Sequence, residues 1–125
     1  MQGIDPDDIM SRFVAWLTGG EYTPAGETFD QGNTCVEAIH NYIRSGDVST
    51  CGVCGEWANG NGALMRIMPV CLYGFLRESK GDLSVGEVIQ MVHKVAGLTH
   101  NHLRSHIACG IYDFMVKAIL VECGG

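Results

Sequence analysis

An acidic residue in a glycine-flanked loop is the first candidate for chemistry in this sequence. Asp30 lies in the run Phe29-Asp30-Gln31-Gly32-Asn33, directly before a predicted helix. A carboxylate there could hold or activate a water molecule, and the free N–H groups of a helix start can bind an anion. The alternative is a plain helix cap, in which Asp30 or Asn33 accepts hydrogen bonds from backbone N–H groups. The residues alone favour the cap.

Two glycines flank Asn61 just before an apolar segment that begins at Ala63. Gly60 and Gly62 would let a ligand approach the backbone closely, and free N–H groups there would suit a diphosphate. The alternative is a tight turn that needs a positive φ angle. A short Gly-Asn-Gly run does not decide between the two, so both stay open.

Three histidines lie close together at His100, His102 and His106. They could hold a metal ion, since His102 and His106 would share a face of a helix. They could also donate hydrogen bonds to a ribose or a phosphate. No carboxylate lies nearby in the sequence, which argues against the metal. Ligand contact and a partly solvated cluster at a helix start both remain open.

Two further pairs of residues resemble metal-binding motifs. Cys51 and Cys54 have zinc-type spacing, but the sequence has no second such pair to complete four ligands, and a redox role would require a βαβ setting. Asp7 and Asp8 follow Asp5-Pro6 in the first turn of a predicted helix. Acids at that position complement the helix dipole, so a structural role is the better interpretation.

The hydrophobic pattern predicts an all-α fold with one domain. A Ser84-to-Glu87 capping box is expected to open one of the helices, and Pro69 is expected to kink another or to lie near its start. No alternating pattern typical of a strand competes. The expected helices cover residues 6–19, 33 or 34–45, 63–76 (a buried helix), 85–96 and 105–122, the last being the longest.

Composition excludes several classes of protein. The 125 residues carry a net charge of −6, from 14 acidic and 8 basic residues, and no basic run is present. A protein that holds nucleic acid through its phosphates needs clustered Lys and Arg, so nucleic acid is not an expected partner. No apolar stretch is long enough for a membrane span, and the first residues do not form a secretory signal. Cysteines within amphipathic patterns fit a reducing cytoplasm.

Taken together, these segments occur in the order of a known family, the bacterial ADP-ribosylglycohydrolases, which include the dinitrogenase reductase-activating type. Residues 5–16 resemble the stretch before that family's substrate loop. Residues 21–34 resemble its Tyr-Thr-Pro…Phe-Asp-Ile-Gly-Asn-Thr segment, and residues 59–69 resemble its Gly-Asn-Gly-Ser-Leu-Met-Arg-Ile-Ala-Pro signature. Residues 98–102 resemble its Thr-His segment, and residues 107–112 the helix that follows. The resemblance covers nearly the whole chain.

The resemblance implies an all-helical fold, a partial orthogonal bundle, with a site for ADP-ribose beside two divalent ions, magnesium or manganese. It implies hydrolysis of the glycosidic bond that joins ADP-ribose to a protein side chain or a small acceptor. Such a reaction passes through an oxocarbenium-like transition state, which needs nearby negative charge and a positioned water. The expected partner is therefore ADP-ribose or an ADP-ribosylated protein.

Residue by residue, the resemblance assigns roles within that site. Asp30 matches the acid near the metals and is the candidate catalytic residue, and Asn33 matches its polar neighbour. The loop that touches the ribose and the diphosphate corresponds to residues 60–62. His100, and less closely His102, match the histidines that face the ribose.

The departures from the family pattern concern the metals. The family's Thr-Asp-Asp-Thr motif and its Asp-X-Asp-Thr or Asp-X-Asp-Ser motif are not found in this sequence. Ala58 stands where Ser is usual, and Gln31 replaces an apolar residue. We therefore expect a central fragment of the domain that does not bind the two ions and is inactive by itself. The alternatives are a module that binds ADP-ribose or a nucleotide without turnover, and a helical piece that oligomerises through Ile111, Met115 and Ile119.

Overall fold

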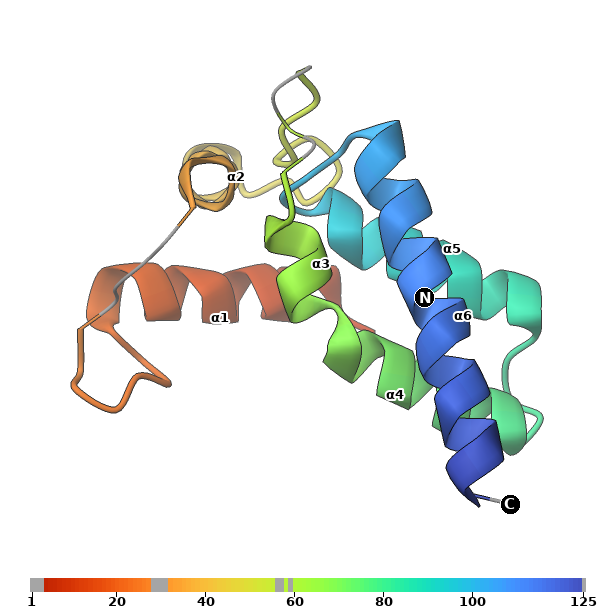
Figure 1. Cartoon of the computed structure of the whole chain (residues 1–125). Helices are drawn as coiled ribbons and strands as arrows, with labels where there is room; N and C mark the ends of the chain where they lie inside the picture. Colours follow the sequence, from red (N-terminus) through yellow and green to blue (C-terminus); the bar gives the residue numbers. More distant parts are fainter. Residues whose placement is uncertain (1–3, 28–31, 56–57, 59, 125) are drawn as a thin grey trace.

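The computed structural model describes residues 4–27, 32–55, 58 and 60–124, and its regular structure there is helical (Figure 1). An isolated bridge between Val53 and His100 is the one extended pairing among these residues. The all-α prediction is confirmed. The helices are α1 (Pro6–Gly19), α2 (Asn33–Ser45), α3 (Gly62–Arg66), α4 (Met68–Ser79), α5 (Val85–Gly97) and α6 (Leu103–Gly124).

Local signals in the sequence set most helix ends. The Asp5 carboxylate accepts hydrogen bonds from two first-turn N–H groups of α1 at 3.1 and 3.2 Å. Gly20 ends that helix in the left-handed region, at φ 69°, and a Cβ there would lie 2.0 Å from the carbonyl oxygen of Gly26. Only glycine fits such a position. Ser84 and Glu87 form the expected capping box at the start of α5.

The helix expected over residues 63–76 is instead two helices, α3 and α4, separated at Ile67. Pro69 explains the break, because its ring would clash with the carbonyl four residues earlier and it has no N–H to donate. It lies in the first turn of α4, where that N–H is not needed. The expectation of a buried helix is met only on one side: Ile67 and Cys71 are buried, but Met65 is 76% exposed and Leu76 56% exposed.

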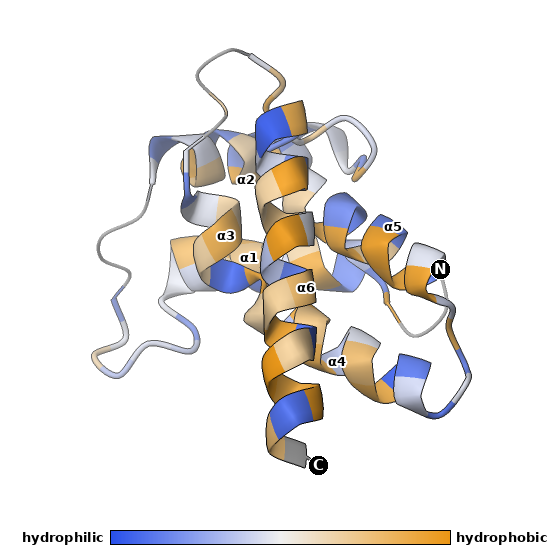
Figure 2. Cartoon of the chain, turned by 45° about the vertical axis from the view of Figure 1, so that its right-hand side comes forward, coloured by the Kyte–Doolittle hydropathy of each residue, from blue (hydrophilic) through white to orange (hydrophobic). Residues whose placement is uncertain are grey.

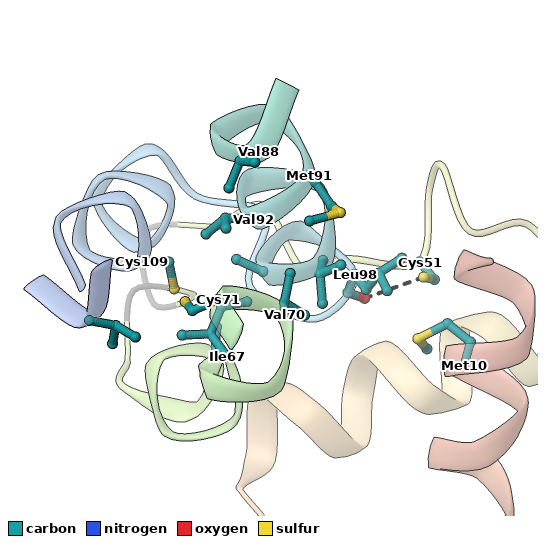
Figure 3. Packing of buried hydrophobic residues seen from close by; sticks show 14 of the residues in the cluster. Met10, Cys51, Ile67, Val70, Cys71, Val88, Met91, Val92, Leu98 and Cys109 are labelled. Carbon is teal, nitrogen blue, oxygen red and sulfur yellow. Dashed lines mark hydrogen bonds between the residues drawn. The ribbon is translucent and has the colours of Figure 1, made fainter. Parts of the chain in front are cut away.

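Two groups of helices share one core. The helices α4, α5 and α6 pack against one another, α1 packs against α2, and α3 contacts α4, α5 and α6. In Figure 1, α2 is seen end-on above α1, which lies lengthwise, so the two helices cross steeply. Figure 3 shows Ile67, Cys71 and Cys109 together on one side of this core and Met10 and Cys51 on the other. All six cysteines are free.

In Figure 2, the side of the long helix α6 that faces the viewer is mostly hydrophobic. Cys109 and Val116 are buried on its inner face, together with the carboxylate-bearing Asp113. Lys117, also directed inward, pairs with Glu78 of α4 at 2.6 Å. No helix within the described residues combines the length and apolarity that a bilayer span requires.

Candidate functional site

A cavity of about 890 Å³ lies among α1, the start of α2, the start of α3 and the turn before α6. It brings together Asn33, Asn61 and His100, which sequence analysis had selected from three separate segments. Asp30, the candidate catalytic residue, lies outside the described residues, as does Asn59. The lining consists of Arg12, Phe13, Trp16, Tyr22, Gly32, Asn33, Thr34, Cys35, Ile39, Gly60, Asn61, Gly62, Met65, Arg66, Thr99 and His100.

The structure does not bring His102 to this cavity. His102 precedes α6, and its Nδ1 accepts a hydrogen bond from the backbone N–H of Arg104 at 3.1 Å. His106 lies one turn into α6 and stacks on His93 of α5, with ring centroids 5.6 Å apart. The shared helix face expected for His102 and His106 is therefore absent, because His102 acts as a cap instead.

Arg66 lines the cavity, and its guanidinium links several elements around it. Its Nη2 donates hydrogen bonds to the carbonyls of Val95 and Ala96, at 3.1 and 3.4 Å, and to the Thr99 hydroxyl. Its Cζ lies 5.2 Å from the centre of the Phe13 ring. Burial lowers the pKa of Arg66, but an arginine remains protonated in proteins. The cation thus joins α3 to the C-terminal end of α5 and to α1.

A chain of hydrogen bonds leads from Arg66 to His100. The guanidinium can only donate, so the Thr99 hydroxyl accepts from it and has its own proton free. The Thr99 Oγ1 lies 2.8 Å from His100 Nδ1. This arrangement favours the neutral imidazole with its proton on Nε2, which makes that nitrogen a donor. Burial, and then the charge of Arg66, lower the pKa of His100 to about 4, so it is neutral at pH 7.

The two glycines around Asn61 differ in what surrounds them. A Cβ on Gly62 would lie 2.7 Å from Cε1 and 2.9 Å from Nε2 of His100, and 3.3 Å from the Cys35 sulfur. Gly62 is therefore required for α3 to pack against His100. A Cβ on Gly60 would meet nothing within 4 Å, so that position is open to a ligand.

The Cys51-to-Cys54 segment positions His100. The backbone N–H of Val53 donates to the Thr99 carbonyl, and Asn101 N–H donates to the Val53 carbonyl, each at 2.9 Å. Cys51 is buried and its thiol donates to the Leu98 carbonyl at 3.3 Å (Figure 3), whereas Cys54 is exposed. The two thiols therefore lie in different surroundings. The backbone of this segment supports the turn that carries His100.

Aromatic residues of α1 and the following loop complete the cavity wall. Phe13, Trp16 and Tyr22 line it, and the exposed Arg12 donates to the Tyr22 hydroxyl at 3.2 Å. None of them was predicted from the sequence to be a site residue. A signal was present, since Trp16 lies beside the apolar stripe of α1 and Arg12 is four residues before it, which places both on one side of the helix. Arg66 was expected only as one residue of the family signature at residues 59–69.

The described residues around the cavity do not fit two divalent ions. They contribute two guanidinium groups, Arg12 and Arg66, and no carboxylate. Among the residues that the structure describes, no group of three His, Cys, Asp or Glu side chains is arranged to hold a metal. Magnesium is held by carboxylates and water, and two adjacent cations need several such ligands. We therefore assign no chemical step to metal ions here.

We predict that His100 makes the fold less stable in acid. The pKa of His100 is about 4 in the folded chain and 6.5 as a free side chain. Above pH 6.5 both states are neutral, and as the pH falls toward 4 only the unfolded state binds the proton. The free energy of unfolding should fall over that range by up to about 3 kcal/mol.

Urea unfolding at pH 7 and pH 4.5 measures this loss, with His100→Gln as the comparison. The variant cannot titrate at this position, so its stability should change less between the two pH values. Equal pH dependence in both proteins would show that His100 does not carry the effect.

Comparison with known proteins identifies a family for this chain. The ADP-ribosylglycohydrolase family model matches residues 1–125. Searches of curated proteins and of solved structures returned no significant match. The family match covers the whole sequence, including every segment that lines the cavity. The chain belongs to the ADP-ribosylglycohydrolase family.

Proposed function

We propose that the cavity binds ADP-ribose and is the substrate-binding part of an ADP-ribosyl glycohydrolase. The observation that supports this most is the convergence of three separate family segments, around Asn33, Asn61 and His100, on one cavity. A volume of about 890 Å³ is within the range of pockets that hold cofactor-sized ligands. The substrates of the reaction would be ADP-ribosylated proteins or small molecules.

The electrostatics of the lining suit a diphosphate. The chain as a whole is negative, at −6, yet the charged side chains among the described lining residues are the cations Arg12 and Arg66. The start of α2 also faces the cavity, its first turn has no acidic residue, and no described side chain caps it. Its N–H groups and the positive end of its dipole favour an anion at that place.

Other lining groups match the rest of the ligand. Phe13, Trp16 and Tyr22 offer flat apolar surface for a base, which stacks on aromatic rings. The neutral His100, with its proton on Nε2, is a donor for a ribose oxygen. Asn61 precedes α3 without capping it through its side chain, so its amide is free to bond a sugar or a phosphate.

We predict weak, metal-independent binding of ADP-ribose, with a Kd on the order of 1 mM. Asn61→Ala should weaken binding roughly fivefold through the loss of one hydrogen bond. Gly60→Ala should weaken it as well, because its methyl group meets no protein atom within 4 Å and stands where the ligand would approach.

Isothermal titration calorimetry measures these affinities. Gly55→Ala is the matched control, since a Cβ there also meets nothing within 4 Å and Gly55 does not line the cavity. Equal losses in the Gly55 and Gly60 variants, or no binding at millimolar ADP-ribose, would contradict the proposal.

We also predict that the 125-residue chain alone releases no detectable ADP-ribose from a modified protein, with or without magnesium. Hydrolysis of the glycosidic bond requires a positioned water and stabilisation of positive charge at the sugar. The described lining residues include no carboxylate that could stabilise that positive charge. Chromatographic detection of free ADP-ribose is the assay, with Asp30→Ala beside the unaltered chain. Clear release that disappears in the variant would overturn this prediction.

A further inference from the structure

The outward face of α6 reverses the usual pattern of a surface helix. The two charged residues in the middle of α6 point toward the protein interior. Asp113 is 4% exposed, and Lys117 pairs with Glu78. Between Arg104 and Glu122 its exposed side chains are all apolar. A long exposed apolar strip of this kind marks an interaction surface. The strip consists of Ile107, Ala108, Ile111, Phe114, Met115, Ala118, Ile119 and Val121.

Six exposed positions of α6 form a single straight seam. Their spacing alternates between four and three residues, which is the spacing of the contact positions in a coiled coil. The seam is symmetric about Asp113, whose side chain points away from the seam. From either end, the seam begins with a charged residue, which is followed by an alanine and then by a large apolar residue. In order, the seam is Arg104, Ala108, Ile111, Met115, Ala118 and Glu122.

The charges at the two ends of this seam are unfavourable for α6 by itself. Arg104 lies in the first turn, where the helix dipole is positive, and Glu122 lies in the last turn, where it is negative. Neither side chain forms an ion pair with any residue that the structure describes. A second copy of α6 running in the opposite direction would place a Glu122 beside each Arg104. Each unfavourable charge at a helix end would then be paired with an opposite charge.

We propose that α6 forms an antiparallel homodimer interface with a second copy of this chain, on a two-fold axis beside residue 113. With Arg104 opposite Glu122 of the second copy, Ala108 lies opposite Ala118 and Ile111 opposite Met115. Each contact then occurs twice, as a two-fold interface requires. The alanine layers let the helices approach closely, and the Ile111 and Met115 layers fill the centre. None of the α6 residues that the structure describes lines the cavity, so this interface is independent of the proposed function.

Charge reversal tests the register. We expect sedimentation equilibrium to show a dimer of the unaltered chain. Arg104→Glu and Glu122→Arg should each weaken it roughly tenfold or more, because two attractive pairs become repulsive. The combined variant should restore the affinity. Each single reversal improves the charge at its own helix end, so lost association would not reflect unfolding. Lys94→Glu, an exposed reversal on α5, is the control and should have no effect.

Cysteine cross-linking tests the direction. The exposed cysteines are first removed by Cys54→Ser and Cys123→Ser. In this background, one protein carries Ala108→Cys and another carries Ala118→Cys. A mixture of the two proteins should form a disulfide-linked dimer. Each protein alone should not, because equivalent positions lie about 15 Å apart in the antiparallel pair. Self-cross-linking of either protein would indicate a parallel pair and overturn the proposal. A monomer at every concentration, single reversals without effect, or a different protein bound to α6 in place of a second copy would overturn it as well.

Discussion

The Arg66 guanidinium lies where α1, α3 and the C-terminal end of α5 meet, and its contacts hold these elements together. A buried charge is costly unless it is well hydrogen-bonded. The described residues supply no carboxylate to Arg66; its Nη2 donates to the Val95 and Ala96 carbonyls and the Thr99 hydroxyl, whereas its buried Nε has no hydrogen-bond partner among the described residues. Those carbonyls are at the negative end of the α5 dipole, and Phe13 presents its ring face to the cation. The rest of the cavity is built on this set of contacts.

The shape and chemistry of the cavity follow from that anchor. Thr99 accepts from Arg66 and therefore donates to His100, which fixes the imidazole and its tautomer. The fixed ring leaves no room for a side chain at residue 62, so α3 begins with glycine. The backbone pairing of Val53 with Thr99 and Asn101 supports the same turn from the other side. His100, which we propose as a ligand-binding group, is thereby held by contacts with Thr99, Gly62 and the Val53 backbone.

Much of this architecture was predictable, because the relevant signals are local. Asp5 before Pro6, the Ser84 and Glu87 pair and the glycines that end helices all act within a few residues, and those helix ends agree with expectation. Asn33, Asn61 and His100 were selected because they lie in recognisable segments. Only the family resemblance, and no local signal, indicated that they would lie around one cavity.

What escaped prediction depends on partners distant in sequence. Arg66 looked like an ordinary residue of a helix, and its role appears only once the carbonyls about 30 residues later fold against it. The effect of Pro69 was expected from the sequence, although the separation at Ile67 into two helices was not. The α6 pattern predicted a helix, but not that its charges would face inward. Asp30 lies outside the described residues, and its role stays a prediction.

Amide hydrogen exchange of Arg66→Lys tests most directly whether this cation holds the cavity together. Lysine keeps the charge but cannot reproduce the planar set of donors. The amides of Val53, His100 and Asn101, which are hydrogen-bonded around the braced turn, should exchange at least about tenfold faster than in the unaltered chain. Amides inside α6, such as those of Cys109 and Val116, should change much less. Unchanged exchange at the turn, or a uniform acceleration throughout the chain, would contradict this account.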